Sequence, residues 1–455
     1  MSSPDSLRVA VIGSGPAGIY TADALTRQSR ETVAVDVIDR LPTPYGLVRY
    51  GVAPDHTKIK GVARTLREVL EHPDVRFIGG VRFGRDVTVD DLDRVYDAVV
   101  YATGASVDRK LGIPGEDLPG SVAATDFVNW YCGHPDTDTQ RFLLDAEEIA
   151  VVGAGNVALD VVRILAKSAD ELRHTDIPQP VLDVFAASKV RRVHLLARRG
   201  PLQAKFTAPE LRDLGELANA DITVRPEQVD IDPADEAMLS AARAARTNLK
   251  ILKSWAQQEP AGRPRHVDLR FWVRPIEILG QESVAGLRVE RTELGPDGRL
   301  TGTGEEEVLD VGMVFRSIGY MGVPLPDVPF DDSTRTVPHA EGRVLGPDGA
   351  VLPGQYVAGW IKRGATGVIG TNKSDAAATV RGLLDDAPAL RERRGPGADD
   401  NSIDRLLGER GVTFTDYGDW LTIDAAEAER AADLGRGERV KLHRWDELYG
   451  ALGHS

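Results

Sequence analysis

The chain has 455 residues, of which 42% are hydrophobic and 27% charged, and its formal net charge is −15. This composition is ordinary for a soluble globular protein of two or three domains, whereas the negative charge argues against nucleic-acid binding because phosphates would be repelled. The one cysteine, Cys132, excludes an intrachain disulfide and a cysteine-ligated iron–sulfur cluster. Since no signal sequence and no run of about 20 apolar residues occurs, we expect a cytoplasmic protein without a membrane span.

The first 39 residues have the element order of a dinucleotide-binding unit. Residues 7–12 form a short strand rich in β-branched residues, 13-GSGPAG-18 follows, a helix extends to about residue 28, and the strand 33–38 ends at Asp39. In such a unit the pyrophosphate binds at the helix N-terminus, and the acid accepts hydrogen bonds from ribose hydroxyls. The order therefore favours a site for the adenosine half of FAD or NAD over a plain glycine turn.

Each glycine of this turn has its own expected role. Gly13 permits the tight turn, Gly15 lets the backbone approach a pyrophosphate, and Gly18 lets the helix pack on the strand. A further strand is expected at 97–101, followed by 102-ATGA-105.

The pattern then restarts about 140 residues further on. Residues 149–152 form a strand, 153-GAGNVA-158 is a second glycine turn with Gly153 and Gly155, residues 157–167 form a helix, and 190–197 form the next strand. The third turn position is alanine, which the motif permits. This second unit ends in Arg198 and Arg199 instead of an acid.

The arginine pair indicates a different nucleotide. A guanidinium matches the geometry of a phosphate, so two arginines at this position favour the 2′-phosphate of NADP(H) over a free ribose hydroxyl. The alternative is a solvated arginine pair at a turn. With an acidic first site and a basic second site, the chain is expected to exchange a hydride between NADPH and FAD.

The remaining chain carries fewer signals. Residues 234–257 are expected to form one helix, 267–320 alternate as strands do, and a helix is expected at 374–386, before a linker at 390–402. The loop 364-GATGVIG-370 leads into that helix, whose N-terminal amides would face the flavin; the alternative is an ordinary glycine-rich loop. Because one cysteine cannot form a redox pair, the electron acceptor is external: a protein, a quinone or other small molecule, or oxygen.

Longer strings of residues resemble a known family. These are GSGPAG with 42-PTPYGLVRYGVAPDH-56, 113-IPGEDLPGS-121, 153-GAGNVALDVVRIL-165, 197-ARRGPLQAKFTAPELR-212 and 359-GWIKRGATGVIGTNKSDA-376. Over residues 7–385 they look like adrenodoxin-reductase-type ferredoxin–NADP⁺ reductases, especially the bacterial members. The resemblance implies electron flow from NADPH through FAD to a separate ferredoxin, in one-electron steps, for cytochrome P450-type or other ferredoxin-dependent systems.

The resemblance also implies the fold. We expect an α/β protein of two Rossmann-like, glutathione-reductase-like domains, with the NADP domain at 107–331 inserted into an FAD domain formed by 1–106 and 332–455, the latter with a C-terminal tail. We expect a monomer.

Site residues follow from the resemblance by motif position. FAD contacts are implied for Ala17, Asp39, Leu47 and Val81, and flavin contacts for Trp360, Gly367, Val368 and Ile369. NADP contacts are implied for Asn156, Val157, Arg198, Arg199 and Glu210, and additionally for Arg109 and Gly367. His56 and Asp160 match polar residues near the flavin that relay protons or shape partner docking; the alternatives are a loop histidine and a helix-surface acid. The resemblance departs at Asp213, where we expect glutamate, and gives that residue no role.

An acidic enzyme needs local positive charge to bind an acidic ferredoxin. Arg243, Arg246, Lys250 and Lys253 recur at helical spacing, and residues 237–257 contain no acid. These four cations, the basic stripe, are expected to lie on one helix face and to dock the ferredoxin, unless they are simply a solvated face.

Two other function classes stay open from the residues alone. A flavin monooxygenase or a small-acceptor reductase would share the two glycine turns, but no monooxygenase fingerprint lies between them. A non-enzymatic NADP-sensing or electron-transfer subunit, like the small subunit of glutamate synthase, would need cysteine-ligated clusters that one cysteine cannot supply.

Overall fold

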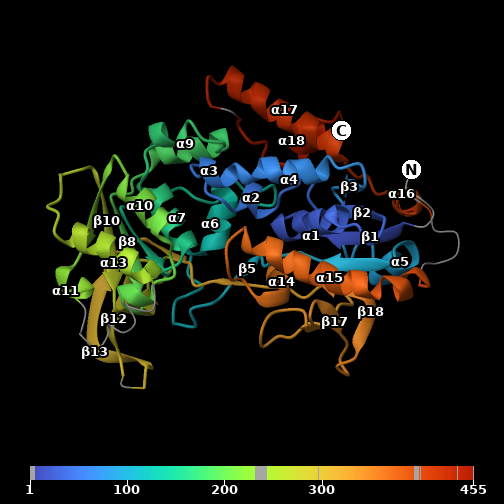
Figure 1. The fold of residues 1–455 in the computed structure, drawn as a ribbon. Coiled ribbons are helices and arrows are strands. Elements are labelled where there is room, and N and C mark those ends of the chain that lie inside the picture. The colour runs from blue at the N-terminus through green and yellow to red at the C-terminus, as the bar shows by residue number, and fades with distance from the viewer. Residues whose placement is uncertain are drawn as a thin grey trace.

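The protein folds around two mainly parallel sheets that lie side by side, each covered by helices (Figure 1). The structure is a computed structural model that describes residues 6–230, 243–295, 297–393, 399, 401–437 and 439–453. The sheets have seven and six strands, in the orders β16-β17-β18-β4-β1-β2-β3 and β6-β14-β7-β8-β10-β9. This arrangement confirms the predicted α/β fold with two dinucleotide-binding units.

The seven-stranded sheet takes strands from both ends of the chain. Its strands are β1 (Leu7–Ile12), β2 (Val33–Ile38), β3 (Val75–Ile78), β4 (Ala98–Tyr101), β16 (His339–Ala340), β17 (Arg343–Leu345) and β18 (Val351–Val357). Strand β1 pairs in parallel with β2 and β4, and all six of its residues are buried. A β-branched-rich run without alternation is expected for a strand covered on both faces, and here even Arg8 is buried, which explains why residues 7–12 were recognisable.

Helices cover this sheet and carry the loops of the first unit. They are α1 (Pro16–Arg27), α2 (Leu47–Tyr50), α3 (Thr57–Lys60), α4 (Val62–Leu70), α5 (Val89–Val95), α14 (Trp360–Arg363) and α15 (Thr371–Arg391). Helix α15 is longer than the predicted 374–386 and overlaps the predicted linker, because Ala387 and Leu390 are buried in the core and continue it past Pro388.

The six-stranded sheet forms the second unit. Its strands are β6 (Ser121–Ala123), β7 (Glu148–Val152), β8 (Arg192–Ala197), β9 (Ala220–Val224), β10 (Arg265–Phe271) and β14 (Met313–Arg316). The helical elements around it are α6 (Ala124–Tyr131), α7 (Asn156–Ala166), α8 (Ala169–Leu172), α9 (Gln179–Ala187), η1 (Pro201–Gln203), α10 (Ala208–Gly215), α11 (Pro226–Val229) and α13 (Arg243–Ala256). The predicted helix at 234–257 is confirmed over α13, and its earlier residues lie outside the described part of the chain.

Two small sheets complete the second unit. Strands β11 (Val273–Leu279), β12 (Gly286–Leu294) and β13 (Leu300–Leu309) form an antiparallel sheet that extends from its end in Figure 1, and β5 (Val107–Asp108) pairs with β15 (Tyr320–Met321). The alternation predicted over 267–320 therefore corresponds to several strands from two different sheets.

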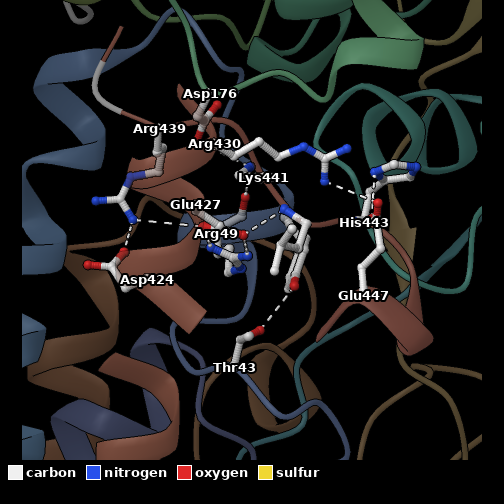
Figure 2. A network of polar contacts seen from close by, with 12 residues as sticks. Thr43, Arg49, Asp176, Asp424, Glu427, Arg430, Arg439, Lys441, His443 and Glu447 are labelled. Carbon is white, nitrogen blue, oxygen red and sulfur yellow. Dashed lines mark hydrogen bonds and ion pairs between the residues drawn. The ribbon is translucent and has the colours of Figure 1, made fainter. Parts of the chain in front are cut away.

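The last 50 residues, in which the sequence shows no motif, form α16 (Ser402–Glu409), α17 (Tyr417–Asp433) and α18 (Trp445–Gly450). Figure 2 shows how they are anchored: Glu427 of α17 is fully buried and pairs with the guanidinium of Arg49. The ammonium of Lys441 donates to the Arg49 carbonyl at 2.6 Å and to the Cys132 carbonyl at 3.0 Å. The C-terminal segment is thus fastened to both sheet units. Within the described residues, no helix is long and apolar enough to cross a membrane.

Candidate dinucleotide and electron-transfer site

The first glycine turn leaves the N-terminus of α1 open. Gly15 is the N-cap residue, and no side chain caps the helix, so its first amides lack an intrahelical partner. A Cβ on Gly18 would lie 1.9 Å from the Gly13 carbonyl oxygen, so only glycine permits this helix to meet the strand. Free amides with an aligned helix dipole form a site that fits a pyrophosphate.

Asp39 lies at the end of β2, directly beside this turn. Its Oδ2 accepts hydrogen bonds from the amide and the hydroxyl of Ser14, each at 2.7 Å, and its Oδ1 accepts one from the Leu41 amide at 3.0 Å. The Val81 amide donates to the Asp39 carbonyl at 2.9 Å, while the Val81 side chain is buried in the core. A carboxylate has about four acceptor positions, so Asp39 retains capacity for a ribose hydroxyl.

Two distant segments converge on the same turn. Gly46, just before Leu47, approaches so closely that a Cβ on it would lie 2.8 Å from the Gly15 Cα. On the other side, a Cβ on Gly359 would lie 2.5 Å from the Ala17 Cβ. The segments predicted to contact FAD therefore meet around one turn, although more than 300 residues separate them.

The expected flavin-lining residues present apolar surface. Leu47 is 39% exposed and Val368 is 57% exposed, which is unusual for large aliphatic side chains in this protein. The Trp360 ring stacks on Tyr320 with centroids 5.7 Å apart, and its indole nitrogen donates to the Thr366 carbonyl at 3.0 Å. An apolar, aromatic-lined surface beside a dinucleotide turn fits an isoalloxazine ring.

The glycine-rich loop 364–370 leads into α15, but the first amides of this helix are not free: those of Thr371, Asn372 and Lys373 donate to carbonyls of residues 368–370 at 2.9, 3.1 and 3.2 Å. Gly370 is the N-cap of α15 without a side-chain cap, and the Thr371 hydroxyl instead accepts from the Val368 amide at 3.1 Å. Gly367 has a φ of +82°, in the left-handed region. Ile369 follows in the same loop and packs against the core of the first unit.

The second turn repeats the geometry of the first. Gly155 is the N-cap of α7, again without a side-chain cap, and a Cβ on it would meet nothing within 4 Å. Asn156 begins the helix, and its side-chain oxygen accepts from the Thr207 amide at 2.8 Å, which ties the loop after the arginines to the turn. Val157 follows within α7. This turn also fits a pyrophosphate.

Arg198 and Arg199 lie at the end of β8, and both side chains are exposed. Among the residues that the structure describes, neither guanidinium has a hydrogen-bond or ion-pair partner. Arg109 is likewise exposed, and its amide donates to the Gly319 carbonyl at 3.0 Å. Two adjacent free guanidiniums at a strand end are arranged to receive an anion.

The structure brings His56 and Asp160 together across the two units. His56 Nε2 lies 2.8 Å from Asp160 Oδ1, and His56 Nδ1 lies 3.6 Å from Asp213 Oδ2. His56 precedes α3 of the first unit, whereas Asp160 belongs to α7 of the second. The resemblance implied roles near the flavin for both residues but no contact between them; in the structure they touch, and Asp213 is the third member of the cluster.

A buried ion pair that no sequence pattern predicted supports this contact. Arg163, which is 1% exposed, donates from Nε and Nη2 to the two oxygens of Asp55 at 2.8 Å each, and from Nη1 to Asp160 Oδ1 at 2.8 Å. Burial would raise the pKa of Asp55, but Arg163 and Lys167 hold it well below its usual range. Asp55 and Arg163 each lie in one of the sequence strings shared with the family, 42–56 and 153–165. The sequence alone does not reveal that these two strings are in contact in the fold.

Glu210 lies near the same cluster, in the first turn of α10. Burial raises its pKa, and the negative charge of Asp160 raises it further. Its Oε2 is buried without a hydrogen-bond partner. An unsatisfied buried carboxylate oxygen is costly, so this atom points to a missing donor such as a ribose hydroxyl.

The basic stripe lies on the solvent face of α13. Arg243, Arg246, Lys250 and Lys253 are all exposed, and within the described residues none has an ion-pair partner. The opposite face of the helix is buried through Leu249, Leu252 and Trp255. The predicted segregation of the cations onto one face is confirmed.

Two glycine turns with uncapped helices, an acid after the first, an arginine pair after the second and an apolar surface beside the first turn define a flavin-dependent pyridine-nucleotide oxidoreductase. Residues 7–248 match the model of the family described as "Pyridine nucleotide-disulphide oxidoreductase".

Relatives specify the branch to which the chain belongs. It is 41% identical to NADPH-ferredoxin reductase FprA of Mycobacterium tuberculosis over 97% of this chain and 98% of the relative. It is 38% identical to the mitochondrial NADPH:adrenodoxin oxidoreductase of Arabidopsis thaliana, over 100% of this chain and 97% of the relative. The solved structure of Mycobacterium tuberculosis FprA in complex with NADPH superposes with a TM-score of 0.92 at 41% identity, covering 98% of this chain and 100% of that one. The chain belongs to the adrenodoxin-reductase-type NADPH–ferredoxin reductases.

Proposed function

We propose that this enzyme transfers electrons from NADPH through FAD to a ferredoxin. The observation that carries the proposal is the contrast between the two ribose ends: a bound carboxylate, Asp39, at the first turn and two free guanidiniums, Arg198 and Arg199, at the second. The names of the relatives, NADPH-ferredoxin reductase and NADPH:adrenodoxin oxidoreductase, agree with this assignment.

FAD, when bound, accepts a hydride and releases electrons one at a time. The residues of this chain bind and orient the two nucleotides. We assign the open amides of α1 and Asp39 to the nucleotide half of FAD, with Leu47 and the segment 360–369 beside its ring. We assign the amides of α7 to the pyrophosphate of NADP, and the arginine pair with Glu210 to its 2′-phosphate and ribose.

A thiol has no place in this reaction. Burial raises the pKa of Cys132 to about 11, and its Sγ donates to the Val52 carbonyl at 3.4 Å. A thiol held in that form at neutral pH is a poor nucleophile and cannot form a disulfide without a second cysteine. Electrons therefore leave the enzyme to an external acceptor.

His56 is the group placed to hold or move a proton between the two units. Its Nε2 faces Asp160 and its Nδ1 faces Asp213. These two carboxylates fix the orientation of the imidazole, and Nη2 of Arg163 lies 2.9 Å from the same Nε2. Replacing His56 by Gln, which keeps hydrogen-bonding capacity without a titratable proton, should lower turnover more than it raises the KM for NADPH.

We also propose that the basic stripe docks the ferredoxin. Complementary charge mainly raises the association rate and makes it dependent on ionic strength. In the double variant Arg243→Glu plus Arg246→Glu, ferredoxin-dependent turnover at low salt should fall about tenfold, with reduction of a small neutral acceptor unchanged. The charge-matched control is Arg64→Glu plus Arg381→Glu, two exposed cations of the other unit. An unchanged rate and salt dependence in the double variant would remove the stripe from the docking surface.

The domain division 1–106, 107–331 and 332–455 is part of the same proposal. It is supported by the strands of the seven-stranded sheet, which all fall in the first and last segments, and by those of the six-stranded sheet, which all fall in the middle one. A cytoplasmic location and a monomeric state stay predictions.

Cytochrome c reduction tests the proposed function. The purified holoenzyme is supplied with NADPH and cytochrome c, and a bacterial ferredoxin is titrated in. A saturable rise in rate with ferredoxin is expected. No rise across several ferredoxins, together with peroxide or an oxygenated product, would instead support a monooxygenase or small-acceptor reductase.

A further inference from the structure

The backbone that carries the arginine pair is held by two residues far along the chain. The hydroxyl of Thr292, in β12, donates to the Arg198 carbonyl at 2.8 Å. The amide of Trp272, between β10 and β11, donates to the Arg199 carbonyl at 3.3 Å. The Thr292 amide in turn donates to the Trp272 carbonyl at 2.9 Å, so the two residues hold each other as well as the loop.

Trp272 has a backbone conformation that a bulky residue rarely adopts. Its φ is +60°, in the left-handed region, and such conformations cost of order 1–3 kcal/mol and concentrate at functional sites. Its ring lies against Gly200, directly after the arginine pair: a Cβ at Gly200 would be 2.3 Å from the ring. The unfavourable conformation thus directs the ring against the loop and the amide towards Arg199.

Thr292 contributes from a fully packed position. It is 2% exposed, and a buried hydroxyl is retained where it has a specific hydrogen-bond partner. Here that partner is the carbonyl of Arg198. The antiparallel sheet β11–β12–β13, which contains none of the predicted cofactor contacts, places this hydroxyl against the arginine loop.

The result is a fixed backbone with free side chains. Arg198 and Arg199 have partners for their carbonyls, whereas among the described residues their guanidiniums have none. A guanidinium binds a phosphate through paired hydrogen bonds. This geometry requires the Cα of the arginine to be held to within about half an ångström. The hydrogen bonds to the two carbonyls fix the backbone in this way and leave both guanidiniums free to bind the phosphate.

We propose that Thr292 and Trp272 are positioning residues that set the preference of this enzyme for a 2′-phosphorylated nucleotide. The inference rests on the proposed assignment of Arg198 and Arg199 to the 2′-phosphate. It predicts that loss of the Thr292 hydroxyl weakens binding of the 2′-phosphate selectively, because the rest of the nucleotide is bound at the second glycine turn.

Calorimetric titration of the holoenzyme with adenosine 2′,5′-bisphosphate and with adenosine 5′-phosphate tests this proposal without any turnover. Thr292→Val keeps the shape and removes the donor; the Kd for the bisphosphate should rise about five- to tenfold, and that for the monophosphate by less than about twofold. Thr292→Ser restores the hydroxyl and should restore affinity. Trp272→Gly suits the backbone conformation, keeps the amide and removes only the ring, and should also weaken the bisphosphate selectively.

The outcomes separate this inference from the function on which it rests. If Arg198→Ala plus Arg199→Ala weakens the bisphosphate but Thr292→Val does not, the positioning role is wrong and the arginine assignment stands. Equal losses for both ligands in Thr292→Val, or no rescue by serine, would reduce Thr292 to a general structural residue. If the double arginine variant binds both ligands as the unmodified enzyme does, the 2′-phosphate assignment and this inference fall together.

Discussion

The two glycine turns have the same backbone geometry but differ in whether the charged side chains beside them already have hydrogen-bond partners. At the first turn the Asp39 carboxylate already accepts three hydrogen bonds from the protein. At the second, the guanidiniums of Arg198 and Arg199 are free among the described residues, and only their carbonyls are held. The difference matches two kinds of ligand: a cofactor that stays bound, enclosed by prearranged groups, and a nucleotide that enters and leaves past exposed side chains.

The largest expected effect lies at the third position of each turn. In Gly18→Ala the new Cβ would lie 1.9 Å from the Gly13 carbonyl, so the turn cannot close and the enzyme should be purified without FAD. The second turn already has alanine there, buried at Ala158. The matched variant Ala158→Gly should keep FAD and cost only about 1 kcal/mol of unfolding free energy. The flavin absorbance of the purified variants measures this; normal flavin content in Gly18→Ala would contradict the assigned geometry.

The contact between the two units is expected to matter nearly as much. Arg163→Met removes the cation shared by Asp55 and Asp160, and breaking a buried pair in this way costs about 3–5 kcal/mol. Denaturant unfolding should show this loss. Lys110→Met, which breaks the exposed pair with Asp117, is the control and should cost less than about 1 kcal/mol. Equal stabilities of the two variants would mean that the buried network does not join the units.

Acid should weaken this same contact. The pKa of Asp55 is well below its unfolded value, so the carboxylate contributes stability that is complete above the unfolded pKa and is lost as pH falls towards the folded one. The free energy of unfolding should therefore decline below about pH 4, and less steeply in Arg163→Met, where only Lys167 still lowers the pKa of Asp55. Parallel declines in both proteins would assign the acid sensitivity to other carboxylates.

The parts that sequence predicted well are those encoded locally. Short hydrophobic patterns and glycine spacing predicted the strand at residues 7–12, both glycine turns and the helix around Arg246. The structure confirms all of these. The contact of His56 with Asp160 was not predicted, because the residues are 104 positions apart and the resemblance implied only a separate role for each.

Other features depend on tertiary packing that no local pattern expresses. Arg163 and Thr292 are an ordinary helix cation and an ordinary strand threonine in sequence, and only the fold gives them partners in other segments. The C-terminal helices were missed for a related reason, since Glu427 and Lys441 look like surface charges until their partners are known.

Anaerobic stopped-flow reduction of the bound flavin by NADPH and by NADH tests the contrast between the two turns most directly. We expect a strong preference for NADPH, and in Arg198→Ala plus Arg199→Ala a rise of about 100-fold in the half-saturating NADPH concentration with little change for NADH. Equal losses with both nucleotides, or an enzyme without preference from the start, would contradict the assignment of the arginine pair to the 2′-phosphate.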